Sequence, residues 1–125
     1  MTGDIHTFFA GEVTPSGREG VPAIDGTPAA TEFVGGSITS KGLEEIIPTD
    51  GPGGEPVTEA GARANNPHYA YVNFPRRGYG VLEARPDELL VDFRVVGTTQ
   101  APQSPVETLA RFRVPAGVPR VERLG

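Results

Sequence analysis

The 125-residue chain contains no cysteine, no tryptophan and only two histidines. Without cysteine, a disulfide, a thiolate metal ligand and a thiol nucleophile are all excluded. No run of about 18 apolar residues occurs, so the sequence predicts no membrane span. The first residues also lack the basic and apolar stretches of a secretory signal peptide, so none is expected.

Positive charge is scarce as well. The chain has 11 Lys and Arg residues against 16 Asp and Glu residues, which gives a net charge of −5 at pH 7. Non-specific nucleic-acid binding depends on a basic surface that attracts phosphates. The composition therefore predicts that nucleic acid is not a partner.

Glycine and proline, in contrast, are abundant, with 17 and 13 residues respectively. They are concentrated in residues 14–30 and 48–67, where they interrupt any regular element, so we predict two long loops there. Residues 41–47 could form one or two helical turns that end at Pro48. The length suits one domain, and we predict a single domain over residues 1–125.

Period-two alternation marks the second half of the chain. Strands are predicted at residues 68–74, 79–84, 89–97 and 108–115, separated by turn residues. In the third of these strands one face is purely apolar and consists of Leu89, Val91, Phe93 and Val95. With shorter strands expected in 5–13 and 31–39, the sequence predicts a mainly β fold with an antiparallel meander over residues 68–114.

Asp4 and His6 are two positions apart and follow Gly3. If this stretch ends a strand, both side chains point to the same side, because side chains alternate along a strand. A carboxylate beside an imidazole suits a metal ion of intermediate softness. The alternative is a frayed terminus with two solvated side chains.

Two further polar stretches are candidates for a site. Asn66 and His68 flank Pro67 at the end of the second loop, where they could border a site or could simply form a turn. Arg77 lies in an Arg-Arg-Gly turn that could contact phosphate or could be a solvated hairpin tip. Ser37 and Ser40 could offer a phosphate a nest of backbone N–H groups, but the sequence places no base beside them.

Taken together and in order, these motifs resemble the C-terminal end of PhoD-like alkaline phosphatases. The matching stretches are TGDIH, TEFVGGSITS, NNPHYAYVNFPRRGYGVLEARPDELLVDFRVV and SPVETLARFRV. The resemblance covers nearly the whole chain and is poorest over residues 11–30 and 41–64. It implies that the chain is part of an α/β metallophosphoesterase sandwich. Members of the family hydrolyse phosphate monoesters and diesters with Ca²⁺ and Fe³⁺, and they are commonly exported.

The resemblance also implies roles for individual residues. Asp4 and His6 match metal-ligand positions, and Asn66 and His68 match a corner at the edge of the site. The motifs that supply most of the metal ligands in the family come before the Gly-Asp-x-His segment, and this chain begins with that segment. Two ligands do not make a tight metal site, so we expect the chain to contribute ligands, to have no catalytic residue of its own and to be inactive alone.

Two other interpretations stay open. The chain could be a non-catalytic β-domain that serves binding or assembly, with its long loops as the contact surface. It could also be a homo-oligomer in which subunits combine Asp4, His6 and His68 into one metal site. Because the first half of the parent sheet is missing from this chain, an exposed edge of the meander could pair with a partner chain or a second copy. A phosphate ester would bind only where the site is completed.

Overall fold

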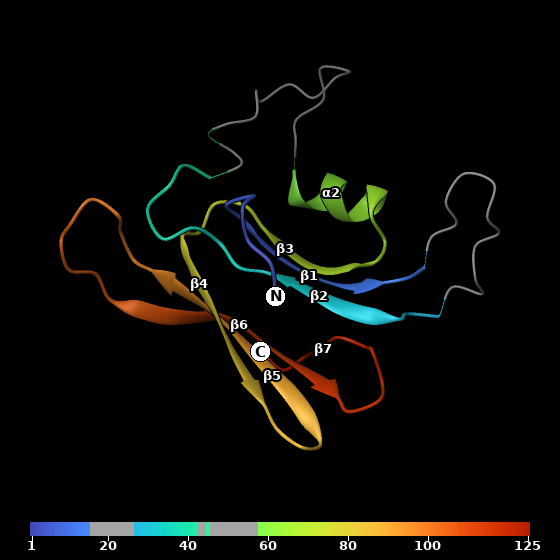
Figure 1. The fold of residues 1–125 in the computed structure, drawn as a ribbon. Helices are drawn as coiled ribbons and strands as arrows, with labels where there is room; N and C mark the ends of the chain where they lie inside the picture. Colours follow the sequence, from blue (N-terminus) through green and yellow to red (C-terminus); the bar gives the residue numbers. More distant parts are fainter. Residues whose placement is uncertain (16–26, 43–44, 46–57) are drawn as a thin grey trace.

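The computed structural model describes residues 1–15, 27–42, 45 and 58–125, and strands dominate this part of the chain (Figure 1). In chain order the elements are β1 (Phe8–Val13), β2 (Ala30–Val34), α2 (Glu59–Asn65), β3 (Tyr69–Asn73), β4 (Gly78–Ala84), β5 (Glu88–Val96), β6 (Val106–Pro115) and β7 (Glu122–Arg123). The prediction of a mainly β fold is confirmed.

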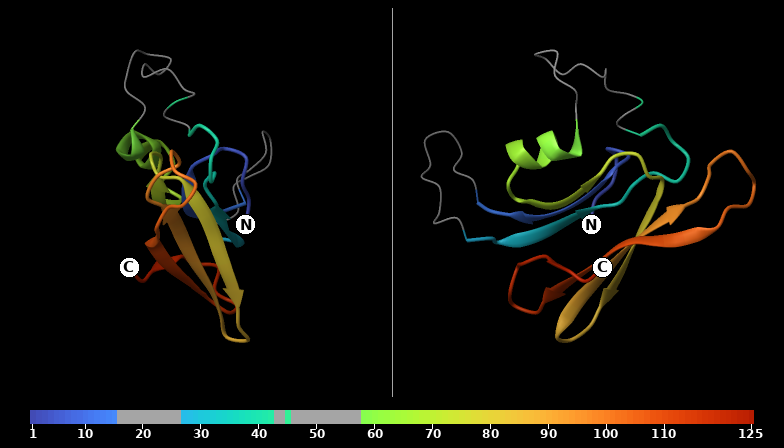
Figure 2. Two further views of the ribbon diagram at one scale, coloured as in Figure 1. Left: turned by 90° about the vertical axis from the view of Figure 1, so that its left-hand side faces the viewer. Right: turned by 180° about the vertical axis from the view of Figure 1, so that it is seen from behind.

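The strands form two sheets that pack face to face (Figures 1 and 2). One sheet has the strand order β2-β1-β3, and the other has the order β4-β5-β6-β7. All neighbouring strands in both sheets are antiparallel. The four-stranded sheet is a meander, because its strands are neighbours both in sequence and in space.

The meander differs from the predicted one at its start. Strand β3 was expected to pair with the strand after it, but it pairs with β1, with Phe8 opposite Asn73. The backbone groups that a hairpin would use here have other partners. The Asn73 carbonyl accepts a bond from the Thr7 hydroxyl at 2.5 Å, and the Phe74 N–H donates to the Glu59 carboxylate at 2.8 Å. The chain therefore crosses to the second sheet, where the meander begins at Gly78.

Gly78 occupies a crowded point in this crossover. A Cβ atom at this position would lie 1.9 Å from the Arg94 carbonyl oxygen, so no side chain fits without moving the backbone of β5. The Gly78 N–H donates to the Ser37 carbonyl at 2.8 Å. The crossover is thus attached to the loop that follows β2.

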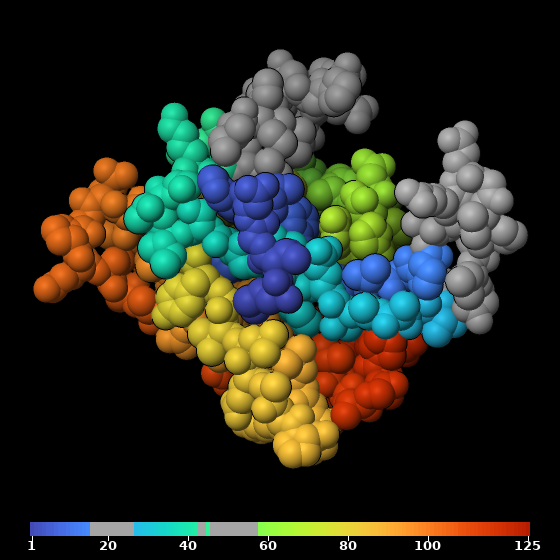
Figure 3. Space-filling model, viewed as in Figure 1, coloured from blue at the N-terminus to red at the C-terminus, as the bar shows by residue number. Residues whose placement is uncertain are grey.

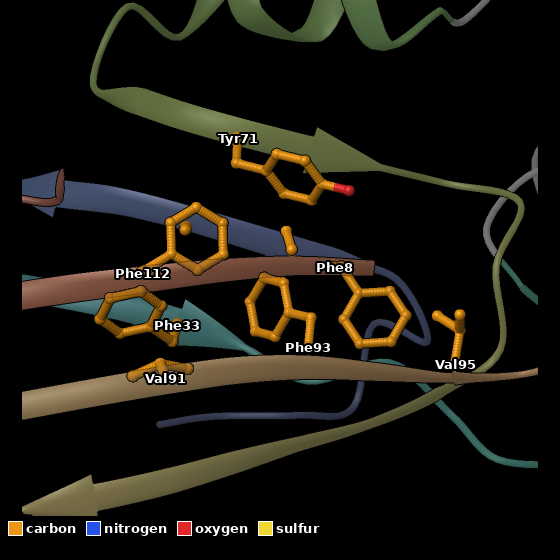
Figure 4. Close-up of a cluster of buried hydrophobic side chains, with 9 residues drawn as sticks. Phe8, Phe33, Tyr71, Val91, Phe93, Val95 and Phe112 are labelled. Carbon is orange, nitrogen blue, oxygen red and sulfur yellow. The ribbon is translucent and has the colours of Figure 1, made fainter. Parts of the chain in front are cut away.

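The core lies between the two sheets and is rich in aromatic rings (Figure 4). Phe93 lies at its centre, with its ring centroid 4.9 Å from that of Phe8 and 5.2 Å from that of Phe112. The predicted apolar face of β5 is confirmed, because Val91, Phe93 and Val95 are fully buried. Each such side chain stabilises the fold by roughly 1.5–3 kcal/mol relative to leaving it exposed.

A second apolar cluster lies on the outer face of the three-stranded sheet, and Figure 2 shows α2 over this face. Its buried members are Phe9, Val34, Val72 and Phe74, with Ala62 of α2 packed against them. Helix α2 falls within the segment 48–67, which was predicted as a loop, and this part of the prediction is wrong. The Thr58 side chain caps the helix by accepting a bond from the Gly61 N–H at 3.0 Å. Most of the helical turn expected over residues 41–47, and much of both long loops, lies outside the described residues.

Candidate metal site in the turn before β1

The segment that carries Asp4 and His6 is attached at both ends. The Thr2 N–H donates to the Phe33 carbonyl at 2.8 Å, and the Gly35 N–H donates to the Thr2 carbonyl at 3.0 Å. At the other end Thr7 is fully buried, and its hydroxyl is bonded to β3. Figure 3 shows these N-terminal residues on the surface, in contact with the stretch that contains β2. A frayed terminus is therefore not what the structure shows.

Between these attachments the backbone forms a turn rather than a strand. Strand β1 begins only at Phe8, so the alternation expected to align Asp4 with His6 is absent. Instead, Asp4 has a φ of 77° and His6 a φ of 59°, and they are the only described non-glycine residues with positive φ. Such left-handed backbone costs about 1–3 kcal/mol per residue, persists where its surroundings enforce it and is frequent at ligand sites.

One hydrogen bond fixes the imidazole of His6. Its Nδ1 atom lies 2.8 Å from the Lys41 carbonyl oxygen. A carbonyl can only accept, so Nδ1 carries the proton in the neutral ring and Nε2 keeps its lone pair, to which no described residue is bonded. Histidines that bind metals typically donate their other ring N–H in this way. Asp4 is exposed, and no described residue forms a hydrogen bond to its carboxylate.

The loop beside His6 consists of residues 37–42. The Ser40 N–H donates to the Ser37 hydroxyl at 2.9 Å, so these two serines make a local turn with each other. An open groove of about 610 Å³ runs along this loop, and its polar lining includes Lys41, Arg76 and Thr98. A polar groove therefore adjoins the His6 turn.

Arg77, the predicted phosphate contact, is engaged with the protein itself. Its side chain is only 13% exposed. Nε donates to the Ser40 carbonyl at 3.0 Å, Nη1 donates to the Pro75 carbonyl at 3.1 Å, and Nη2 forms an ion pair with Glu45. These contacts use one hydrogen of each guanidinium nitrogen, and the bond to Ser40 attaches Arg77 to the loop.

Asn66 and His68 lie at the end of the β1–β3 strand pair that is opposite the His6 turn. Asn66 caps α2, with its Nδ2 donating to the Ala62 carbonyl at 2.9 Å. His68 is exposed, and its ring centroid is 4.3 Å from that of Tyr69. Strand β3 runs from this end towards the His6 turn, and a rise of about 3.3 Å per residue puts His68 roughly 15 Å from Asn73, which pairs with Phe8 at the other end. The structure does not bring Asn66 and His68 to the Asp4–His6 turn within one chain.

Asp4 and His6 have the donor types that suit a metal of the expected kind, but they are only two side chains. Within the described ranges, no group of three or more His, Cys, Asp or Glu side chains could hold an ion. The Lys41 carbonyl, which orients His6, was missed from the sequence because a backbone carbonyl leaves no residue-type signal.

In the described part of the chain no helix has the length and apolarity needed to cross a membrane.

Comparison with known proteins identifies the family of this chain. The sequence model of the PhoD-like phosphatases matches residues 1–93. The chain belongs to the PhoD-like phosphatase family. A solved structure described as "Structure of PhoD" has a similar fold, with a TM-score of 0.73 and 22% sequence identity. That match covers 99% of this chain but 21% of the PhoD chain, so the present chain spans about a fifth of the PhoD length. No curated protein matches the chain significantly.

Proposed function

We propose that this chain is the C-terminal part of a PhoD-like metal-dependent phosphomonoesterase or phosphodiesterase, to which it contributes Asp4 and His6 as metal ligands. The observation that carries the proposal is the hydrogen bond from His6 Nδ1 to the Lys41 carbonyl, which leaves Nε2 free as a ligand atom. The left-handed backbone at both residues supports the same function, because strain of this kind collects at ligand sites.

The proposal assigns the metal chemistry to the completed site. When bound, Ca²⁺ and Fe³⁺ of the family would neutralise phosphoryl charge and lower the pKa of a bound water. This chain would hold the ions through the Asp4 carboxylate and His6 Nε2, and the phosphate ester would be the substrate. Alone, with two ligands, the chain would bind metal weakly, with a dissociation constant of about 10⁻⁴–10⁻³ M or higher, and would not hydrolyse esters.

A titration of the isotopically labelled, metal-free chain tests the ligand assignment. Substoichiometric Mn²⁺ broadens the NMR signals of nuclei near its binding site. We expect broadening at residues 3–7 in the parent chain and none there in Asp4→Asn or His6→Gln. Asp87→Asn and His68→Gln are matched controls, because both residues are exposed and lie outside this turn. Equal broadening in all five proteins, or none near residues 3–7, would refute the assignment.

A second experiment tests the hydrolytic function. The chain would be mixed with a protein that carries the remaining PhoD-like motifs, and the hydrolysis of p-nitrophenyl phosphate and its diester would be followed. We expect hydrolysis in the mixture that neither part shows alone and that Asp4→Asn abolishes. A stable complex without metal binding or hydrolysis would instead favour the alternative of a non-catalytic binding or assembly domain.

A further inference from the structure

The guanidinium of Arg77 and the carboxylate of Glu45 together hold two backbone groups of the loop beside His6. Arg77 Nε is bonded to the Ser40 carbonyl at 3.0 Å, and Arg77 Nη2 pairs with Glu45. The same Glu45 carboxylate accepts a bond from the Gly42 N–H at 2.8 Å. The Ser40 carbonyl and the Gly42 N–H lie on either side of residue 41.

The Gly42 N–H and the Lys41 carbonyl belong to the same peptide unit. A peptide unit is planar, so fixing its N–H also fixes the direction of its carbonyl. Glu45 binds one end of this unit and His6 Nδ1 binds the other, at 2.8 Å each. The orientation of the His6 ring is thus linked through one rigid group to the ion pair of Glu45 with Arg77.

The local packing leaves little room for another arrangement. Gly42 is buried, and a Cβ atom there would lie 2.5 Å from Arg77 Nη1. The hydrogen bond from Gly42, with the nearby charge of Arg77, lowers the pKa of Glu45 although partial desolvation opposes this shift. Glu45 is therefore ionised at neutral pH, which the ion pair requires.

From this geometry we propose that Arg77 is a positioning residue for His6 and that it acts through Glu45 and the Lys41–Gly42 peptide unit. It holds the Lys41 carbonyl where it accepts the Nδ1 proton of His6, and so it selects the tautomer whose Nε2 atom is free. The proposal rests on the proposed metal role of His6 for its functional meaning, but the tautomer can be measured without metal.

The test is the tautomer of His6 in the metal-free, ¹⁵N-labelled chain, read from imidazole ¹H–¹⁵N correlations at about pH 8, above the ordinary histidine pKa of about 6.5. His68→Gln assigns the signals, because the chain has two histidines. We expect the Nδ1–H form in the parent chain and a mixture of both tautomers in Arg77→Gln. Arg76→Gln is the matched control, since Arg76 pairs with Glu107 and touches neither His6 nor residue 41 in the described contacts.

A second variant guards against a folding defect in Arg77→Gln. Gly42→Ala keeps every charge and displaces the end of a flexible side chain, and we expect it to mix the tautomers as well. An unchanged Nδ1–H form in both variants, with amide spectra of folded protein, would overturn the proposal. A parent chain with the Nε2–H form would overturn it too.

The failure of this proposal and the failure of the proposed function give different results. If the His6 tautomer depends on Arg77 but Mn²⁺ does not broaden the signals of residues 3–7, the positioning role of Arg77 is supported and the metal-ligand role of Asp4 and His6 is refuted. If Mn²⁺ binds at Asp4 and His6 but the His6 tautomer is unchanged in Arg77→Gln, only the positioning role of Arg77 is refuted. Where both hold, we expect Arg77→Gln to weaken Mn²⁺ binding roughly 10–100-fold, as with other residues that orient a ligand.

Discussion

The carboxylate of Glu59, in the first turn of α2, accepts a hydrogen bond from the backbone N–H of Phe74 at 2.8 Å, across 15 residues of sequence. This bond joins the helix to the point at which β3 ends and the chain leaves for the second sheet. The Phe74 side chain is itself buried in the cluster under α2. The helix and the end of the strand are therefore held together by a hydrogen bond to a carboxylate and by packing in this apolar cluster.

Glu59→Ala should lower the free energy of unfolding by about 1–2 kcal/mol, because a half-buried N–H loses its charged acceptor. Urea denaturation followed by circular dichroism measures the change. Glu59→Gln keeps an acceptor oxygen and should be less destabilising. If the alanine and glutamine variants were equally stable, the bond to Phe74 would not matter for stability.

Phe93→Ala should be far more destabilising, by about 3–5 kcal/mol, because it removes a ring at the centre of the core. The same urea experiment applies. Leu82→Ala is the comparison, since Leu82 is 43% exposed and its loss should cost much less. A change below about 1 kcal/mol for Phe93→Ala would contradict the packing of the two sheets against this residue.

Substitutions of Asp4 test whether the turn before β1 has the left-handed backbone conformation in solution. Asn tolerates positive φ, so Asp4→Asn should leave stability nearly unchanged. Valine is strained there, and Asp4→Val should lose about 1–2 kcal/mol. Thermal or urea unfolding of the pair gives the difference. Equal stability of the two variants would mean that residue 4 does not hold this backbone conformation in solution.

The chain should lose stability in strongly basic solution through Tyr71. Burial raises the pKa of its hydroxyl above the usual value of 10.0. The folded state then resists ionisation, so the contribution of the neutral ring is complete below pH 10 and is lost as pH rises through the folded-state pKa. The melting temperature measured from pH 8 to 11 should fall more steeply for the parent than for Tyr71→Phe. Parallel curves would show that Tyr71 titrates normally.

Much of the β architecture could be predicted because its signal is local. The alternation that buries Val91, Phe93 and Val95 is visible in nine consecutive residues. The sheet to which β3 belongs could not be predicted, since it depends on Thr7 and Glu59, which are distant in sequence. Helix α2 was hidden by Gly61 and by the surrounding proline and glycine, whereas its cap at Thr58 is a signal that could have been used.

The candidate site likewise has features that the sequence predicts and features that it does not. The Gly-Asp-x-His segment that contains Asp4 and His6, and the family of the chain, could be recognised from the sequence. Their backbone conformation was not, because it is imposed by hydrogen bonds from Thr2 and Thr7 to other strands. Arg77 was predicted as a possible phosphate contact, but its partners Ser40 and Glu45 are more than 30 positions away and could not be predicted.

The crossover between the sheets has a consequence for how this sequence can vary. Gly78 meets β5 on one side and bonds the Ser37 carbonyl on the other, in the loop that orients His6. A side chain at position 78 would force β4 away from β5 and would pull on that loop at the same time. Homologues that retain the turn carrying Asp4 and His6 should therefore keep glycine at this position, even though the buried Gly78 belongs to neither apolar cluster. Substitution of this glycine in a relative would indicate a protein in which the loop beside His6 is no longer attached to the start of β4.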